Sequence, residues 1–459
     1  MGIIERQDLL AVYYAGNSRE QTKYRHEYSL VEVKKRERDL SPLLKKLPAD
    51  ILRFLEIAGD LAEKYQLRLY LVGGQVRDIF LKVENRDLDI VLEGDLGSYI
   101  RELADVFKVQ YIYNAQFRTG NLVLPCGLNI DLAGLRRESY RYSGALPDVE
   151  PAEDILEDLF RRDYTVNSLV LSLNKAEWGL LLDFFNGLED LQEGKLRLLH
   201  PFSFLDDPIR IIRGIRLAVK TGFTFEEESF ALLEEVLTRA DFSRLSLDRV
   251  LKEMKLLFAS PVDPALVALL RSYPVFRLLK LELEIDEKLT EQARELESYL
   301  AEFGEKNYNI EEWVMRMALF LADAGEGVLN WKVRSDFKEI FLAYYRYKHL
   351  LVELDRNLAA DELAAKLKGL RDEELLILLV KAGSRRIKEN ILRYMKELKD
   401  IELKINGRDL LANGLEPGPL IREILDEVYR KRLKGSLDTR EEQLAYARDL
   451  IRKSGENKE

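Results

Sequence analysis

Two aspartates, Asp87 and Asp89, stand one residue apart near the end of the stretch LYLVGGQVRDIFLKVENRDLDIVL. Successive side chains of a β-strand point to opposite faces, so both carboxylates are expected on one face, roughly 7 Å apart. Such a pair suits a divalent metal. Upstream, Gly73 and Gly74 let backbone N–H groups approach an anion, and the helix expected after them offers its N-terminus to a phosphate. Either motif alone is more often a surface turn with solvated acids, but their order predicts a site for a nucleoside triphosphate with magnesium.

The same stretch resembles a family signature. The run Gly73-Gly74-Gln75-Val76-Arg77-Asp78, followed by Asp87-Leu88-Asp89, is similar to the signature of the class II tRNA nucleotidyltransferase and bacterial poly(A) polymerase family. The resemblance implies that Asp87 and Asp89 bind two Mg²⁺ ions and that Gly73, Gly74 and Arg77 serve the triphosphate. In nucleotidyl transfer, one ion lowers the pKa of the attacking hydroxyl and the other neutralises the leaving pyrophosphate. Asp78 is expected to hold Arg77 or the turn.

A third aspartate, Asp131, lies in a run that alternates apolar and polar residues between Leu128 and Leu135. The alternation turns Asp131 away from the apolar face, where it could meet the Asp87 and Asp89 pair. We therefore include Asp131 among the candidate catalytic residues. A solvated aspartate on an exposed strand face is the alternative.

A second motif, Arg161-Arg162-Asp163-Tyr164-Thr165-Val166-Asn167, resembles the Arg-Arg-Asp ribose motif of the same family. An acid beside two guanidinium groups can accept a ribose 2′-hydroxyl while the arginines hold triphosphate oxygens in bidentate fashion. We take Arg162, Asp163 and Asn167 as nucleotide-binding candidates. Asp163 could equally cap a helix that begins at Tyr164, and the two roles are compatible.

A third motif begins at Asp206-Asp207-Pro208, which predicts a helix start because proline suits the first helical position. On that helix Arg210, Arg213 and Arg216 form one stripe, opposite a face of isoleucines. Arginine stripes are most often solvated surface. The acid-acid-x-x-Arg pattern resembles the base-reading motif of the family, which favours nucleotide binding.

The chemistry of the bases indicates what such a motif would select. Cytosine and adenine each present an amino donor beside an unprotonated ring nitrogen, whereas uracil and guanine present a carbonyl beside a ring N–H. An acceptor beside a donor, Asp207 with Arg210, matches C and A and leaves unpaired groups against U and G. The prediction is use of CTP and ATP, or of ATP alone. CCA-adding members usually carry Glu where this chain has Asp206, which leaves the relative use of C and A open.

Periodicity predicts a small α/β head followed by an extended helical body. The resemblance implies an α+β fold with a small nucleotidyltransferase head, built of a mixed β-sheet and flanking helices, followed by an extended all-helical neck, body and tail. Net charge is −10, yet the 71 basic residues can still cluster on one face and bind RNA. One cysteine, Cys126, and no membrane-length apolar run predict a cytoplasmic protein. The expected domains are 1–45 (the end of a CBS-like domain and a linker), 46–180 (catalytic head), 181–262 (neck, base recognition), 263–395 (body) and 396–459 (tail, tRNA binding).

Motifs outside the head bear on RNA binding. Residues 1–16 resemble the end of a CBS domain, with a simple strand and helix as the alternative. Ser246-Leu247-Asp248-Arg249 with Glu253 resembles a helical motif of the family that buttresses the base-reading helix. Residues 405–419 resemble the tail of tRNA-end-adding members, or form a plain turn between helices. Basic and aromatic residues at 344–349, 385–388 and 431–432 are candidate tRNA contacts, or half-buried helix faces.

Together these features predict a template-independent enzyme that adds the 3′-terminal CCA of tRNA, or only its terminal A, from CTP or ATP with release of pyrophosphate. The expected partners are the acceptor stem and 3′ end of tRNA and, for an A-only enzyme, a separate CC-adding enzyme; no membrane is expected. Two alternatives stay open: a poly(A) polymerase of the same family, and a non-catalytic RNA-binding module on the same fold.

Overall fold

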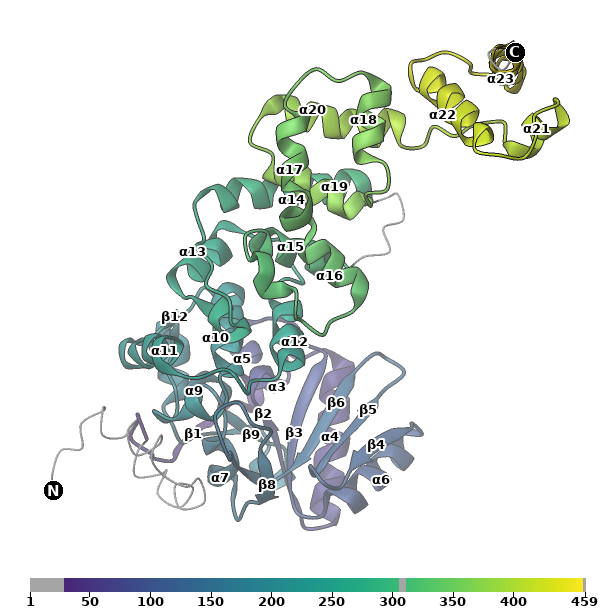
Figure 1. The fold of residues 1–459 in the computed structure, drawn as a ribbon. Helices are drawn as coiled ribbons and strands as arrows, with labels where there is room; N and C mark the ends of the chain where they lie inside the picture. The colour runs from purple at the N-terminus through teal and green to yellow at the C-terminus, as the bar shows by residue number, and fades with distance from the viewer. Residues whose placement is uncertain (1–28, 305–310, 457–459) are drawn as a thin grey trace. The chain divides into compact units, whose positions relative to one another are not determined.

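The computed structural model describes residues 29–304 and 311–456 (Figure 1). The CBS-like match at residues 1–16 lies outside these residues. The chain divides into two compact units, Met1–Leu257 with Ser272–Lys280, and Phe258–Arg271 with Leu281–Glu459. The finer division into head, neck, body and tail stays a prediction.

The first unit is built on a mixed eight-stranded sheet. Its order is β1-β10-β9-β2-β3-β6-β5-β4, and β3 pairs with β6 in parallel whereas the other neighbours are antiparallel. In that order the strands span Arg36–Asp39, Leu180–Asp183, Val170–Ser172, Arg68–Val72, Asp87–Glu93, Asn129–Gly134, Thr119–Val123 and Tyr111–Asn114. The mixed sheet confirms the fold predicted for the head.

Two helices cover one face of this sheet, α4 (Ala49–Lys64) and α6 (Leu96–Phe107). Both are amphipathic, and the hydroxyl of Tyr99 on α6 donates to the carbonyl of Ala58 on α4 at 2.7 Å. Leu88 and Ile90 of β3 are buried, while Asp87 and Asp89 are exposed, so the expected alternation holds. The carboxylates therefore lie on the face that α4 and α6 leave uncovered.

The segments around the sheet complete the first unit. Short helix α5 (Gly74–Leu81) follows β2 through Gly73, whose φ of +72° favours glycine. The segment 139–158 has no clear periodicity in the sequence, yet it contains β8, which pairs with β7, and the start of α7. The remaining bounds are α3 (Ser41–Leu44), β7 (Arg136–Ser139), β8 (Asp148–Pro151), α7 (Ile155–Phe160), α8 (Gly187–Glu193), β11 (Lys195–Leu196), α9 (Ser203–Asp206), α10 (Ile209–Thr221), β12 (Thr224–Phe225), α11 (Glu227–Arg239) and α12 (Leu247–Leu257).

The second unit contains no strand among its described residues. Residues 360–381 form two helices and not one, because the chain turns at Gly369 with a φ of +95°. The helices are α13 (Pro264–Ser272), α14 (Lys288–Gly304), α15 (Glu312–Leu321), α16 (Ser335–Phe341), α17 (Ala343–Leu354), α18 (Ala360–Leu367), α19 (Asp372–Lys381), α20 (Arg385–Arg393), α21 (Gly407–Ala412), α22 (Leu420–Leu433) and α23 (Arg440–Glu456). Throughout the described ranges, each helix is too short or too polar to cross a membrane.

Candidate active site

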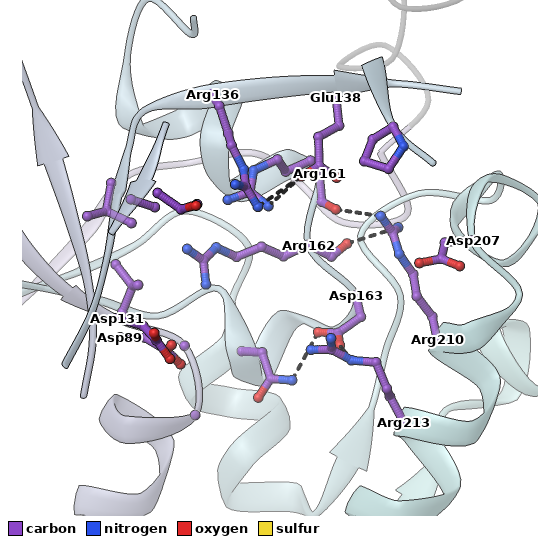
Figure 2. Close-up of a pocket in the computed structure, with 18 of the residues that line it drawn as sticks. Asp89, Asp131, Arg136, Glu138, Arg161, Arg162, Asp163, Asp207, Arg210 and Arg213 are labelled. Carbon is purple, nitrogen blue, oxygen red and sulfur yellow. Dashed lines mark hydrogen bonds and ion pairs between the residues drawn. The ribbon is translucent and has the colours of Figure 1, made fainter. Parts of the chain in front are cut away.

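A cavity of about 810 Å³ opens in the first unit beside the carboxylate-bearing face of the sheet (Figure 2). Such a volume is in the range that binds ligands of nucleotide size. Twelve of the thirteen residues that the sequence predicted for the site line it: Gly73, Gly74, Arg77, Asp89, Asp131, Arg162, Asp163, Asn167, Asp207, Arg210, Arg213 and Arg216. The thirteenth, Asp87, is not among the lining residues.

The cavity is strongly basic in an acidic protein. Nine Lys or Arg side chains and five Asp or Glu side chains line it, an excess of four positive charges. The lining also contains five charged residues and one tyrosine that were not predicted as part of the site: Arg136, Glu138, Tyr140, Arg161, Lys220 and Arg249. The local field therefore suits a polyanion such as a triphosphate.

Asp89 and Asp131 form the acidic end of the cavity. They stand opposite each other in the parallel register of β3 and β6, and Figure 2 shows their carboxylates side by side. Partial desolvation in the cavity raises the pKa of Asp89, and the like charges of Asp131 and Asp87 add to this against the opposing effect of Arg162 and Arg213. A cation bound at this end of the cavity would reduce the repulsion between the carboxylates of Asp89, Asp131 and Asp87.

The carboxylates fit magnesium that enters with a nucleotide. In the described part of the chain, no three His, Cys, Asp or Glu side chains are arranged to hold a metal ion alone. Magnesium usually takes one or two carboxylates and completes its shell with substrate phosphates and water. Asp89 and Asp131 supply that number of hard oxygen ligands at one spot.

Asp87 is tied to the same set by two asparagine amides. Asn129 Nδ2 donates to Asp87 Oδ1 at 3.2 Å, and Asn121 Nδ2 lies 2.7 Å from Asn129 Oδ1 and 2.8 Å from Asp131 Oδ1. The two amides thus connect Asp87 on β3 with Asp131 on β6 through Asn121 on β5. Asp87 lies on the same face as Asp89, one pleat beyond the cavity wall.

Glycines bring the arginines close to this acidic end. A Cβ at Gly73 would lie 3.2 Å from Arg162 Nη1 and 3.6 Å from Asp89 Oδ2, and one at Gly74 would lie 3.2 Å from Arg77 Nη2. Side chains at both positions would crowd the space between the cations and the carboxylate. Figure 2 shows Arg162 extending across the cavity toward Asp89 and Asp131.

Arg77 is held by Asp78, as the sequence predicted. Asp78 Oδ1 accepts from Arg77 Nε at 3.0 Å and from Nη2 at 2.7 Å, and Asp78 Oδ2 accepts from Asn85 and Lys220. Arg77 Nη1 in turn donates to Asn167 Oδ1 at 2.6 Å. Because Asp78 is fully buried and Arg77 is 7% exposed, each neutralises the other in a poorly hydrated place.

We expect Asp78→Ala to lower the free energy of unfolding of the first unit by about 3–5 kcal/mol, because it leaves the Arg77 charge buried without its partner. Urea unfolding measures the change. Glu150→Gln is the matched control, since its ion pair with Arg137 joins two exposed side chains and is worth about 0–1 kcal/mol. Equal effects of the two substitutions would contradict the assignment.

Asp163 is buried, and both of its carboxylate oxygens accept hydrogen bonds. Burial opposes its ionisation, but Arg213, the Asn167 amide and Arg210 outweigh burial and lower the pKa of Asp163 to about 2. Its Oδ2 accepts from Arg213 Nε at 3.0 Å, and its Oδ1 accepts from Asn167 Nδ2 at 3.0 Å. The carboxylate is therefore ionised, with lone pairs left for a hydroxyl donor.

Arg210 is used mostly to hold the protein together. Nη1 donates to the carbonyl of Arg162 at 3.2 Å and to Ser203 Oγ at 2.7 Å, and Nη2 donates to the carbonyl of Arg161 at 2.6 Å and to Tyr140 Oη at 3.5 Å. Arginine has five N–H groups, so Nε–H is the donor left for a ligand. The sequence predicted that Arg210 contacts the base, but it did not predict these hydrogen bonds to the protein.

Asp207 is oriented by a residue from another helix. Arg249 on α12 donates from Nη2 to Asp207 Oδ2 at 2.8 Å, and from Nη1 to the carbonyls of Gly144 and Ala145 at 3.1 and 3.3 Å. The other oxygen, Oδ1, takes a longer bond of 3.3 Å from the Ile209 amide. Asp207 therefore presents Oδ1 to the cavity as an acceptor.

Known proteins similar to this chain include tRNA nucleotidyltransferases and CCA-adding enzymes. A family model described as "Poly A polymerase head domain" matches residues 69–197, and one described as "tRNA nucleotidyltransferase domain 2 putative" matches residues 387–447. The A-adding tRNA nucleotidyltransferase of Geobacter sulfurreducens is 30% identical over 97% of this chain, which spans 52% of that relative's length. The A-adding tRNA nucleotidyltransferase of Halalkalibacterium halodurans is 30% identical, over 88% of this chain and 94% of the relative. The structure of the Thermotoga maritima CCA-adding enzyme complexed with tRNA has a TM-score of 0.74 at 26% identity, covering 90% of this chain and 99% of that one.

Proposed function

Since this chain belongs to the class II tRNA nucleotidyltransferase family, we propose that it adds the terminal adenosine of the CCA end to tRNA. The observation that carries the proposal is the cavity, whose lining brings the Asp89 and Asp131 pair together with an excess of Lys and Arg, the ionised Asp163 and Asp207. Addition of A alone is favoured over addition of all of CCA, because both relatives above are A-adding enzymes.

In the proposed reaction the 3′-hydroxyl oxygen of the tRNA forms a bond to the α-phosphorus of ATP. The bond from that phosphorus to the oxygen bridging to the β-phosphate breaks, pyrophosphate leaves with the electron pair, and the hydroxyl proton passes to solvent. Asp87, Asp89 and Asp131 would hold two Mg²⁺ ions, whose chemistry is to acidify the hydroxyl and to neutralise the leaving group. Three carboxylates for two ions leaves room for phosphate oxygens as ligands.

The arginine-rich walls serve the nucleotide. The triphosphate would bind at Gly73, Gly74, Arg77 and Arg162. At this place the two guanidinium groups and the start of α5 lie next to the carboxylates. Asp163 would accept the ribose 2′-hydroxyl. Asp207 Oδ1 and Arg210 Nε–H would meet the amino donor and ring nitrogen of adenine. Arg213 and Arg216, whose guanidinium groups are partly exposed, would complete the positive field.

The test is incubation with tRNA ending before CCA, after C and after CC, each with CTP or ATP separately. We expect one A added to the CC-ending tRNA and no use of CTP on any of the three. Incorporation of CTP into the two shorter tRNAs together with A into the CC-ending tRNA would make the chain a full CCA-adding enzyme. A long A tail on RNA of arbitrary sequence would make it a poly(A) polymerase, and RNA binding without incorporation would support the non-catalytic alternative.

The proposal extends to partners and place. The expected partners are the acceptor stem and 3′ end of tRNA, ATP and, since A is added only after CC, a separate enzyme that adds the two cytidines. We propose a cytoplasmic location, supported by a single cysteine, Cys126, which is exposed and unpaired with another cysteine.

A further inference from the structure

One row of side chains crosses four strands of the sheet and continues past the cavity. Asp89 on β3 is in register with Asp131 on β6, Asp131 with Asn121 on β5, and Asn121 with Ile112 on β4. Residues directly opposite in neighbouring strands project from the same face. The carboxylates and Ile112 therefore share one face of the sheet.

A second row runs beside the first. Asp87 pairs with Asn129, and Asn129 pairs with Val123. Val123 is 55% exposed and Ile112 is 73% exposed, which is unusual for large aliphatic side chains on a sheet. The opposite face is covered at β5, since α6 packs on β4, β5 and β6 and Leu122 is 1% exposed, whereas Tyr111 and Tyr113 on that face of the edge strand β4 are each 38% exposed. We call Ile112, Asn121 and Val123 the outer face.

The outer face adjoins the cavity directly. Thr119 on β5 lines the cavity, and Asn121 is the next residue of β5 on the same side. Arg162 lies toward the other neighbour of β3, because Gly73, which approaches both Arg162 Nη1 and Asp89 Oδ2, follows β2. Arg136 follows β6, and its Nη1 donates at 3.1 Å to the carbonyl of Phe117, two residues before β5. The carboxylates thus stand between a cationic side at β2 and the uncharged residues of the outer face on β5 and β4.

The geometry of nucleotidyl transfer determines on which side of the carboxylates the pyrophosphate and the acceptor hydroxyl lie. The attacking and leaving oxygens are roughly in line through the phosphorus, so the hydroxyl approaches from the side opposite the pyrophosphate. The pyrophosphate belongs on the cationic side. The acceptor hydroxyl must therefore come over β5 and β4.

On the basis of the function proposed above, we propose that the outer face holds the 3′-terminal nucleotide of the RNA acceptor. Ile112 and Val123 pack against its sugar and base, and the nearby carboxylates repel the RNA phosphates. An uncharged, apolar face suits a base or sugar, and every base offers an apolar ring face, so this contact does not depend on sequence.

The test is the double variant Ile112→Ser and Val123→Ser, assayed with CC-ending tRNA and ATP. We expect the KM for tRNA to rise about tenfold while the KM for ATP stays within twofold. Tyr111→Ser is the matched control, because Tyr111 lies on the same strand with its side chain on the opposite face. An unchanged tRNA KM would overturn the proposal, and so would a rise confined to the KM for ATP.

A second measurement does not depend on turnover. A photoreactive benzoyl-phenylalanine at position 112 should crosslink to the last nucleotide of tRNA, and the same group at position 111 should not. If wild-type protein incorporates nothing, the proposed function fails by itself, whereas the crosslink still reports where RNA lies. Sedimentation that shows a dimer lost in the double variant would assign the outer face to a second copy of the chain and overturn the proposal.

Discussion

Asp89→Asn is expected to reduce incorporation of A by about 10³-fold or more while leaving ATP binding measurable. The substitution keeps the shape of the side chain and removes one of the two charges that converge at the acidic end of the cavity. Loss of a metal-borne stabilisation of about 4 kcal/mol in the transition state corresponds to that factor. Asp131→Asn is expected to act in the same direction, because the two carboxylates stand opposite each other.

Single-turnover incorporation measures the effect, with equilibrium binding of ATP as the second readout. Glu93→Gln is the matched control, since Glu93 lies on β3, on the same face as Asp89, and outside the cavity lining. It should retain activity within about twofold, as surface substitutions away from a site usually change little. Full incorporation by Asp89→Asn would remove the metal assignment and with it the proposed chemistry.

Local rules were enough to find most of the candidate site. The alternation of a strand placed Asp89 and Asp131 on an exposed face, and both facts follow from residues within a few positions of each. The turn at Gly73 and the start of α10 after Pro208 follow from backbone preferences of single residues. The order of the motifs then predicted the mixed sheet and the helical remainder.

Pairings between distant segments were beyond those rules. The hairpin of β7 and β8 brings Arg136 and Glu138 to the cavity, and nothing in the period of residues 139–158 indicates it. The donors of Arg210 are taken by carbonyls almost fifty positions earlier in the chain. Whether Asp87 lines the cavity depends on how far the cavity wall extends over the neighbouring strands. The spacing of residues along one strand does not determine that extent.

Asp207→Asn is expected to lower kcat/KM for ATP by about 10²-fold and to weaken rejection of UTP and GTP. Arg249 Nη2 donates to Asp207 Oδ2, so an asparagine would turn its oxygen to Arg249 and its NH₂ group to the cavity. A donor would then face the amino donor of adenine, and an unpaired buried polar contact of this kind costs about 1–3 kcal/mol. The same donor would suit the carbonyl of uracil or guanine.

Adding Arg249→Leu to Asp207→Asn separates orientation from charge. Without Arg249 the amide can rotate and offer its oxygen to adenine, so the double variant should recover part of the ATP activity that the single variant loses. The coupling between the two substitutions is then positive, as expected for residues in direct contact. Arg249→Leu alone should lower selectivity for ATP, because Asp207 loses the partner that fixes it. If the double variant is worse than the product of the two single effects, Arg249 supports the cavity in some other way, and the orientation of Asp207 is not what selects the base.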